Sequence, residues 1–336
     1  MKRIIILLLL LVVAFTGWRF FGSNTDFSED KKSLYVKTGS TIEDVINSIE
    51  QDSILKNTGS FEWLSKRFGY DKNVKPGRYL ISKGSSIFKV LRLLKSGKQT
   101  AINLVITKLR TKEDLAAKIA SGFECDSSAF IDFLNNNDSL STYGLDTNTA
   151  MTAIIPNTYS IYWNTSAHKI FRKLFNESER FWNDDRKAKA AALNLTTGQV
   201  YTLASIVEEE TNNEDDKGKI ASVYLNRLRA GMKLSADPTI KFALCNFSLK
   251  RIYTGNIAAC SASPYNTYLK TGLPPGPICT PSPKTIDAVL NAPATDYLYF
   301  VAKPDGTGLS NFTSSYQQHA INARNYQHYL DSLNIK

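Results

Sequence analysis

Three consecutive glutamates, residues 208–210, end a segment that the sequence predicts to be helical. The segment begins at Thr196 with the pattern Thr-x-x-Gln, a capping box in which the hydroxyl and the amide satisfy backbone N–H groups at a helix start. Helical spacing places Glu210 on one face with three apolar residues. These residues are Leu203, Ile206 and Val207. Glu208 and Glu209 point away from this face, so Glu210 is the acid that we expect on the apolar side.

Two effects predict a raised pKa for Glu210. Partial burial on the apolar face disfavours the charged carboxylate. The helix is predicted to end near Asn212, so the negative end of its dipole lies close to this side chain. A glutamic acid that keeps its proton near neutral pH can donate it to a leaving oxygen. The alternative is a solvated acidic run at a helix end, with no part in chemistry.

A second predicted helix follows, with acidic residues from Glu214 to Asp216 in its first turn and Gly231 at its end. Beyond it, Asp237 and Pro238 have the spacing of an N-cap and a proline at the first helical position. Asp237 is therefore either a capping residue alone or a further acid of the same site.

Ordered motifs extend from residue 204 to residue 302. The first three are Ala204-Ser205-Ile206-Val207-Glu208-x-Glu210-Thr211, Ala221-Ser222-Val223-x-x-Asn226-Arg227-Leu228 and Leu234-x-x-Asp237-Pro238-Thr239. The later ones are Ser263-Pro264-Tyr265-Asn266-Thr267-Tyr268, Gly272-Leu273-Pro274-Pro275-Gly276-Pro277-Ile278 and Tyr297-Leu298-Tyr299-Phe300-Val301-Ala302. In this order they resemble the motifs of the YceG-like endolytic murein transglycosylases.

By this resemblance, the acid directly before Thr211 is the catalytic one, in agreement with the helix-face argument. We also expect four polar residues of these motifs to support catalysis or to bind the substrate. They are Glu208, Thr211, Asn226 and Asp237. The family usually has an aspartate after the proline of Ile-Ile-Pro and a glutamate several residues before it. This chain has Asn157 and no acid in residues 149–152, so it departs from the family where a second catalytic acid would lie.

Residues 245–280 are predicted to be loop-like and are rich in Tyr, Asn, Pro and Gly. Tyr265 and Tyr268 offer flat faces for sugar rings, and Asn266 can hydrogen-bond hydroxyl or acetamido groups. The prolines of residues 273–277 would stiffen the loop at little ordering cost. The alternative is a loop that packs for structural reasons alone.

The chain begins with Lys2 and Arg3, followed by an uninterrupted apolar run from Ile4 to Phe15. A basic start before an apolar run is typical of a cleaved signal peptide or of a signal anchor. No small-x-small cleavage site follows, and the segment up to Phe21 is long enough for one membrane span. We therefore favour an uncleaved anchor at residues 1–21. The basic residues would hold the N-terminus in the cytoplasm and place the rest on the periplasmic, or extracytoplasmic, side of the inner (cytoplasmic) membrane.

The formal net charge of +10 fits an anionic membrane surface or an anionic cell-wall polymer. A nucleic acid is the competing partner for a basic chain. The basic residues, however, are spread along the sequence, with no aromatic-interleaved patch and no base-reading motif. Export across the membrane argues against nucleic acid as well, so no such partner is expected.

After a polar linker at residues 22–33, residues 34–100 contain an internal repeat. The pattern Gly-Ser-(Thr/Ser)-Ile-x-x-Val occurs in residues 39–49 and again in residues 84–94. Each copy predicts a strand, a glycine turn, a Ser/Thr cap and an amphipathic helix. The resembled family holds a LysM-like module in this place, which is thought to contact peptidoglycan. The alternative is a spacer between the membrane and the active site.

We expect an α+β protein with three folded parts after the anchor and linker. The LysM-like module is followed by a connecting subdomain at residues 101–190, in which residues 154–159 are predicted to be a buried strand. Residues 191–336 form the YceG-like α+β catalytic domain, with the catalytic glutamate on a helix. Near its end, residues 297–302 and 309–313 are predicted to be paired strands.

The four cysteines fit no metal-binding pattern, and the three histidines lie far from them in sequence. In an exported chain, Cys245 and Cys260 are the pair best spaced for a disulfide, although connectivity cannot be read from sequence. Cys125 and Cys279 complete the set. No phosphate-binding glycine loop is present either, so we expect neither a metal nor a cofactor.

These features predict an endolytic lytic transglycosylase that cleaves the MurNAc–GlcNAc β-1,4 bond of nascent peptidoglycan strands. Glu210 would protonate the leaving oxygen, and the MurNAc 6-hydroxyl would attack C1 and leave a 1,6-anhydroMurNAc end. The resemblance implies cutting beside the membrane, where it would terminate strand elongation, with peptidoglycan synthases as natural partners. Two alternatives stay open. One is a hydrolytic muramidase with Glu208, Glu214 or Asp237 as second carboxylate, and the other a non-catalytic peptidoglycan-binding scaffold.

Overall fold

The structure is a computed structural model and describes residues 2–333 of the chain. It divides into two compact units. Unit 1 comprises the chain up to Leu104 together with residues 119–126 and 160–166, and unit 2 comprises residues 105–118, 127–159 and 167 onward. Each unit has a hydrophobic core of its own. The predicted connecting subdomain is thus shared between the two units.

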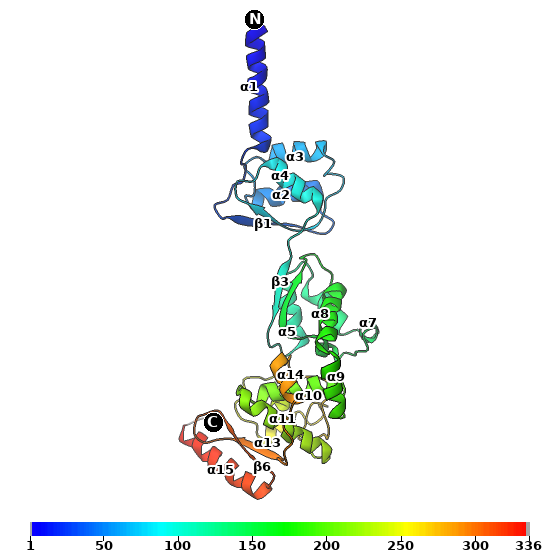
Figure 1. Cartoon of the computed structure of the whole chain (residues 1–336), viewed down its shortest axis with the longest axis vertical. Coiled ribbons are helices and arrows are strands. Elements are labelled where there is room, and N and C mark those ends of the chain that lie inside the picture. Colours follow the sequence, from blue (N-terminus) through cyan, green and yellow to red (C-terminus); the bar gives the residue numbers. More distant parts are fainter. Residues whose placement is uncertain (1, 334–336) are drawn as a thin grey trace. The chain divides into compact units, whose positions relative to one another are not determined.

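Unit 1 contains a module of two strands and three helices (Figure 1). The strands β1 (Lys31–Val36) and β2 (Gly77–Ser82) are antiparallel and pair along their whole length. The helices are α2 (Ile42–Gln51), α3 (Thr58–Arg67) and α4 (Ile87–Ser96). Apolar residues from all five elements form one buried cluster, so the module has the core that a small folded domain requires.

The internal repeat is confirmed as two copies of a strand, a turn and a helix. Gly39 and Gly84 both adopt positive φ, 83° and 75°, which lets the chain turn sharply after each strand. Thr41 and Ser86 then cap α2 and α4 by accepting a backbone N–H from the third helical residue. Each helix buries its predicted apolar positions in the module core: Ile42, Val45 and Ile49 in α2, and Ile87, Val90, Leu91 and Leu94 in α4.

The helix α1 (Lys2–Phe21) precedes this module and has a mean hydropathy of 2.5 over its most apolar stretch. Within residues 2–333 it is the one helix long and apolar enough to cross a membrane. Its last turn contacts the module. Arg19 donates a hydrogen bond from Nε to Ser60, and the Phe21 ring lies 5.1 Å from the Phe88 ring of α4.

The chain then forms short elements up to residue 192. In order, they are β3 (Ile102–Ile106), α5 (Lys112–Ala120), α6 (Ser127–Leu134), α7 (Asn137–Ser141), a 3-10 helix (Ala150–Ala153), β4 (Asn157–Ile161), α8 (Ala167–Phe181) and α9 (Asp184–Ala192). The strands β3 and β4 pair with each other.

The buried strand predicted at residues 154–159 is only partly right, because β4 begins at Asn157. Ile154 and Ile155 are buried but lie before the strand. Their carbonyl groups accept hydrogen bonds from the hydroxyl groups of Tyr201 and Tyr159. Pro156 follows them and has no N–H to contribute to a strand ladder. Tyrosine hydroxyl groups therefore provide the hydrogen bonds to these two carbonyl groups that a neighbouring strand would have provided in the predicted sheet.

The central helix of unit 2 is α10 (Thr197–Glu210), which begins with the predicted capping box. All residues from Val200 to Val207 are buried. This corrects the expectation of a helix with one apolar face, because a helix surrounded by other elements is apolar on every side. The neighbouring helices are α9, α11 (Glu214–Arg229), α12 (Asp237–Ala243) and α14 (Pro283–Leu290).

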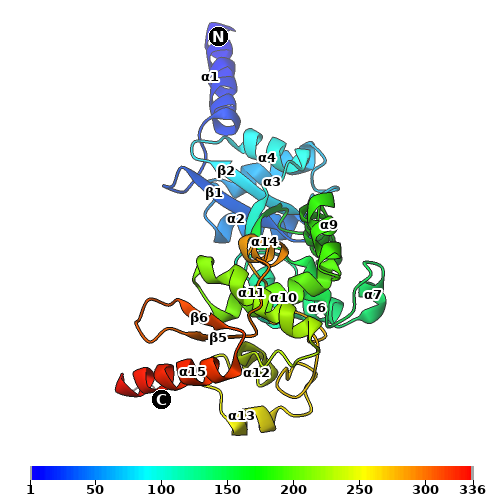
Figure 2. The ribbon, with the colours of Figure 1, turned by 60° about the horizontal axis from the view of Figure 1, so that its bottom comes forward.

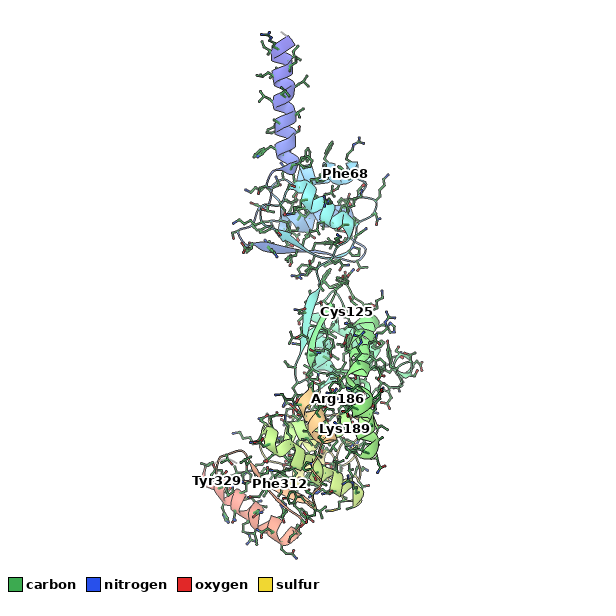
Figure 3. The ribbon with its side chains drawn as sticks, viewed as in Figure 1. Phe68, Cys125, Arg186, Lys189, Phe312 and Tyr329 are labelled. Carbon is green, nitrogen blue, oxygen red and sulfur yellow. The ribbon has the colours of Figure 1, made fainter. Side chains whose placement is uncertain are left out.

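The C-terminal part of unit 2 contains the predicted strand pair. The strands β5 (Tyr299–Ala302) and β6 (Ser310–Thr313) are antiparallel, with Tyr299 opposite Thr313. The helix α15 (Tyr316–Ser332) runs alongside them (Figure 2) and contacts both strands. Figure 3 labels Phe312 on β6 and Tyr329 on α15. Between residues 245 and 280 the structure contains one short helix, α13 (Thr254–Ala259), in agreement with the predicted loop.

A buried lysine connects α10, α11 and α14. Lys217 is 3 % exposed, and its Nζ donates to Glu214 and to Thr285 at 2.8 Å each and to Glu208 at 3.3 Å. Thr285 also donates its hydroxyl proton to Glu208. We call these four residues the lysine cluster. It neutralises a carboxylate at the end of the central helix and ties three helices to one another.

We expect Lys217→Met to lower the free energy of unfolding of unit 2 by about 3 kcal/mol, because it leaves the carboxylate of Glu208 buried without a cation. Equilibrium urea unfolding measures this change. Lys189→Met is the matched control (Figure 3), since Lys189 forms an exposed ion pair with Asp185 and its loss is expected to cost less than about 1 kcal/mol. Equal effects of the two substitutions would contradict a structural role for the lysine cluster.

Candidate active site

The three glutamates at the end of α10 point in three directions, because successive helical residues are turned by about 100°. Glu208 belongs to the lysine cluster. Glu209 pairs with two basic side chains, Lys108 at 2.9 Å and Arg110 at 3.0 Å. Glu210 forms no ion pair within residues 2–333 and accepts a hydrogen bond at 2.5 Å from the hydroxyl group of Tyr224 on α11. Glu210 is thus the one acid of the three whose charge no cation directly neutralises.

Glu210 lines a pocket of about 350 Å³ at the C-terminal end of α10. This volume lies within the range of sites for small ligands. The other lining residues come from α11, α12, β5, α15 and the loops beside them. They are Tyr224, Arg227, Leu234, Ser235, Asp237, Tyr268, Phe300 and His319. The pocket combines a carboxyl group with aromatic rings and hydroxyl groups, so it offers a ligand both flat apolar faces and hydrogen-bonding groups.

Burial raises the pKa of Glu210 from an ordinary 4.5 to about 7. The hydrogen bond from Tyr224 favours the charged form and lowers the pKa, while the negative charge of Asp237 raises it. The positive charges of Lys241 and Arg227 lower it by smaller amounts. Burial outweighs the hydrogen bond, so near neutral pH roughly half of the molecules carry a protonated Glu210. Such a group can donate a proton and take it back at the same pH.

Asp237 is a second carboxyl group of this pocket. The sequence predicted it as the N-cap of a helix, but Ala236 holds that position and no side chain caps α12. Asp237 is the first helical residue, and its Oδ1 accepts a hydrogen bond at 2.5 Å from the hydroxyl group of Tyr268. Burial raises the pKa of Asp237, while the Tyr268 hydrogen bond and the charge of Lys241 lower it. The Asp237 carboxyl group therefore accepts a hydrogen bond from a tyrosine hydroxyl group and does not cap the helix backbone.

Sequence reasoning missed Arg227 as a pocket residue. Its Nε donates to the carbonyl of Leu298 at 2.7 Å, and its Nη1 donates to the carbonyl of Leu234 at the same distance. Its guanidinium also lies 5.2 Å from the ring centre of Tyr299. These contacts hold a positive charge at the edge of the pocket, where it can act on a bound ligand and on the carboxyl groups.

Sequence reasoning also missed Tyr224 and His319. Tyr224 occupies an apolar position of α11, and a hydroxyl group there needs a buried partner, a signal that could have revealed it. His319 comes from α15, more than 100 residues after Glu210, and stacks on Tyr299 with 5.1 Å between ring centres. Burial lowers the pKa of His319, and so does the charge of Arg227. No sequence pattern connects His319 to α10.

Three of the predicted supporting residues lie outside the pocket. Glu208 belongs to the lysine cluster. The hydroxyl oxygen of Thr211 accepts the N–H of Asn213 at 3.0 Å and so shapes the turn between α10 and α11. Asn226 donates from Nδ2 to two carbonyl groups of the loop before β5, each at 2.9 Å. Thr211 and Asn226 thus hold the backbone around the pocket.

Of the predicted sugar-binding residues in the loop, Tyr268 lines the pocket, while Tyr265 and Asn266 take other places. Tyr265 packs on Phe242 with 4.7 Å between ring centres. Asn266 is 0 % exposed, and its Nδ2 donates to the carbonyl groups of Ile257 and Cys260. The structure thus corrects the expectation for Asn266. Its amide group donates hydrogen bonds to backbone carbonyl groups of the loop, and its side chain has no exposed surface that could contact a sugar.

The cysteines and the acidic residues form no metal site in the described part of the chain. No group of three or more His, Cys, Asp or Glu side chains could hold an ion there. Cys245 and Cys260, the pair best spaced for a disulfide, are both free thiols; Cys245 is exposed and Cys260 is buried. The Cys260 thiol donates instead to the carbonyl group of Asn256, one helical turn earlier.

The fold and the pocket define a class of protein: an α+β chain in which a glutamic acid at the end of a buried helix faces a small ligand site. Residues 34–325 match the YceG-like family, and the chain belongs to that family, as its motifs predicted.

Among characterised proteins, the chain is similar to the endolytic murein transglycosylase of Bacillus subtilis (strain 168). The two are 27 % identical over 308 residues, which cover 87 % of this chain and 84 % of that protein. The endolytic murein transglycosylase of Streptococcus pneumoniae (strain ATCC BAA-255 / R6) is 32 % identical over 154 residues, 44 % of this chain and 27 % of that protein. The crystal structure of a yceG-like protein from Listeria monocytogenes is similar with a TM-score of 0.59 at 25 % identity, covering 88 % of this chain and 99 % of that one.

We expect Glu210→Gln to change how stability depends on pH. A folded-state pKa of about 7 against an ordinary 4.5 means that Glu210 costs increasing stability as the pH rises from 4.5 to 7. The substitution removes this cost, so the variant should gain stability relative to the wild type over that interval, by about 3 kcal/mol in total. Urea unfolding at a series of pH values measures the difference. A difference that does not vary with pH would contradict the raised pKa.

We expect Asp237→Asn to lower the pKa of Glu210, because the negative charge of Asp237 raises it in the wild type. Titration of the glutamate carboxyl carbons by NMR measures the pKa in both proteins. Asp215→Asn removes the same charge from an exposed position in the first turn of α11 and is the control. An equal shift in both variants would show a general charge effect rather than coupling inside the pocket.

Proposed function

We propose that this chain is an endolytic lytic transglycosylase that cleaves the glycan strands of peptidoglycan, a lyase reaction. The observation that supports this most directly is Glu210, a carboxyl group with a pKa of about 7 in a ligand-sized pocket. The relatives named endolytic murein transglycosylase supply the substrate class, and one of them aligns with most of the chain.

In the proposed reaction, Glu210 donates its proton to the glycosidic oxygen between MurNAc and GlcNAc. The bond from C1 of MurNAc to this oxygen breaks, and the 6-hydroxyl of the same MurNAc forms a new bond to C1. The hydroxyl proton passes to the Glu210 carboxylate, which restores the acid. The products are a 1,6-anhydroMurNAc end and a free GlcNAc 4-hydroxyl, and no water is consumed. Because the nucleophile is part of the substrate, proximity replaces a second enzyme carboxylate.

A hydrolytic muramidase is the second candidate, because Asp237 gives the pocket another carboxyl group. Hydrolysis needs that group ionised, either to attack C1 or to activate water. The Tyr268 hydroxyl group already donates a hydrogen bond to one oxygen of Asp237, so this oxygen is not free to attack C1 or to activate water. This contact favours a positioning role, in which the negative charge of Asp237 supports the protonated state of Glu210 and its carboxylate fixes Tyr268 at the pocket wall.

The remaining features extend the proposal to a location. The helix α1 would anchor the chain in the cytoplasmic membrane, with the pocket on the extracytoplasmic side. The unit 1 module would act as a LysM-like contact to peptidoglycan. Cleavage would then occur on nascent strands close to the membrane and would limit their length. Peptidoglycan synthases, which extend the same strands, are the partners that this position implies.

We expect Glu210→Gln to lower glycan cleavage by about 10²–10⁴-fold, the usual contribution of a general acid, while binding to glycan strands is kept. Digestion of purified glycan strands followed by mass spectrometry measures both the rate and the product. Asp215→Asn is the control, because Asp215 is an exposed acid five residues further along the chain and lies outside the pocket.

Product mass separates the candidate reactions. A transglycosylase fragment is lighter than the hydrolysed fragment by one water molecule. Fragments that carry the added water would establish the muramidase. If the wild-type protein binds strands but cleaves none, the chain is a scaffold and the proposal fails.

A further inference from the structure

A second pocket, of about 490 Å³, lies in unit 1 beside α4 and β2. Its wall is partly apolar, with Leu80, Phe88 and Leu93. Its polar lining includes three basic side chains, and no acidic residue is among those that line it. The basic residues are Lys89, Arg92 and Lys98. A pocket that combines apolar surface with uncompensated positive charge fits a ligand that carries an anionic group next to an apolar part.

The three basic side chains are available to such a ligand. Each is exposed, and none forms an ion pair or a side-chain hydrogen bond within residues 2–333. Lys89 and Arg92 are three positions apart on α4 and therefore lie on the same face, and Lys98 follows the end of the helix. By contrast, the neighbouring Lys95 donates to the carbonyl of Phe68 and lies over its ring. The charges that line the pocket thus have no partner of their own.

The pocket lies next to the end of α1. Phe88 lines it and contacts Phe21, the last residue of α1, with 5.1 Å between ring centres. Phe68, labelled in Figure 3, also packs on Phe88, with 5.7 Å between ring centres. The last turn of α1 is rich in aromatic residues and contains Arg19, the composition found where a membrane helix reaches the lipid headgroups. If α1 spans a membrane, Phe88 and its pocket lie at the level of the headgroups.

From this arrangement we propose that the pocket binds the phosphate headgroup of an anionic phospholipid. Lys89, Arg92 and Lys98 surround the phosphate, and Phe88 and Leu93 contact the glycerol and the first acyl carbons. The inference rests on α1 as a membrane anchor, which is part of the proposed function. The bound lipid would hold the module against the membrane surface and so fix the orientation of unit 1 relative to the bilayer.

The test uses the full chain in a neutral detergent and dihexanoyl phosphatidylglycerol as the probe, with binding measured by isothermal titration calorimetry. Phosphatidylglycerol should bind, and the triple variant Lys89→Gln/Arg92→Gln/Lys98→Gln should bind it about 100-fold more weakly, given the usual contribution of each basic residue beside an anionic lipid. The control is Lys31→Gln/Lys37→Gln/Arg67→Gln. It removes the same charges from exposed positions of the same module that do not line the pocket, and it should bind as the wild type does.

Further ligands separate the sources of the anionic group. Dihexanoyl phosphatidylcholine and inorganic phosphate should each bind much more weakly than phosphatidylglycerol. The proposal is overturned if inorganic phosphate binds equally well, if both triple variants lose affinity equally, or if glycan fragments of peptidoglycan displace the lipid. Circular dichroism shows that each variant is folded.

The inference and the proposed function can fail separately. Glu210→Gln should bind phosphatidylglycerol as the wild type does, and the pocket variant should retain glycan cleavage in detergent. Flotation of the full chain with neutral vesicles reports on the α1 anchor by itself. A chain that floats but shows no preference for phosphatidylglycerol contradicts the lipid pocket and leaves the anchor in place.

Discussion

The partial burial of Glu210 is the constraint on which the site depends. Burial disfavours the carboxylate, while the Tyr224 hydrogen bond favours it, and the result is a pKa of about 7. Tyr224 can provide this bond because it is itself part of the core between α10 and α11, with its ring at the edge of Phe300. The packing that stabilises unit 2 therefore also sets the proton affinity of the candidate acid. The proton affinity of Glu210 and the stability of unit 2 thus depend on the same packing.

Much of the fold follows from local patterns. The capping box at Thr196, the two glycine turns and the strand pair near the C-terminus were all predicted, since each depends on residues close together in sequence. The raised pKa of Glu210 was also predicted, although by an argument about one apolar face that does not hold for a helix buried on all sides. The walls of the pocket could not be predicted. They come from α11, α12, β5 and α15, and only tertiary packing brings His319 to Glu210.

Polar residues near the site illustrate a limit of reading function from motifs. Asn226 and Asn266 both belong to motifs that resemble the family, and both use their amide groups on backbone carbonyls. A loop that passes close to a site leaves many carbonyl and N–H groups without partners in a helix or strand, and buried ones need partners. A motif residue can therefore be essential by fixing a turn. Tyr268 and Asp237, which the same segments carry into the pocket, depend on those turns for their position.

Glu208 and Glu209, which precede Glu210, also fix the rotation of α10 about its own axis. Glu208 is bound to Lys217 on one side and Glu209 to Lys108 and Arg110 on another, so the helix end is held from two directions about 100° apart. One residue inserted into or deleted from α10 would rotate this end by the same angle and break both sets of ion pairs together. Length changes among relatives should therefore accumulate in loops, while the helix keeps a constant number of residues between its cap and its acid. The ion pairs of Glu208 and Glu209 thus allow a single rotational setting of α10, in which Glu210, the candidate proton donor, faces the pocket.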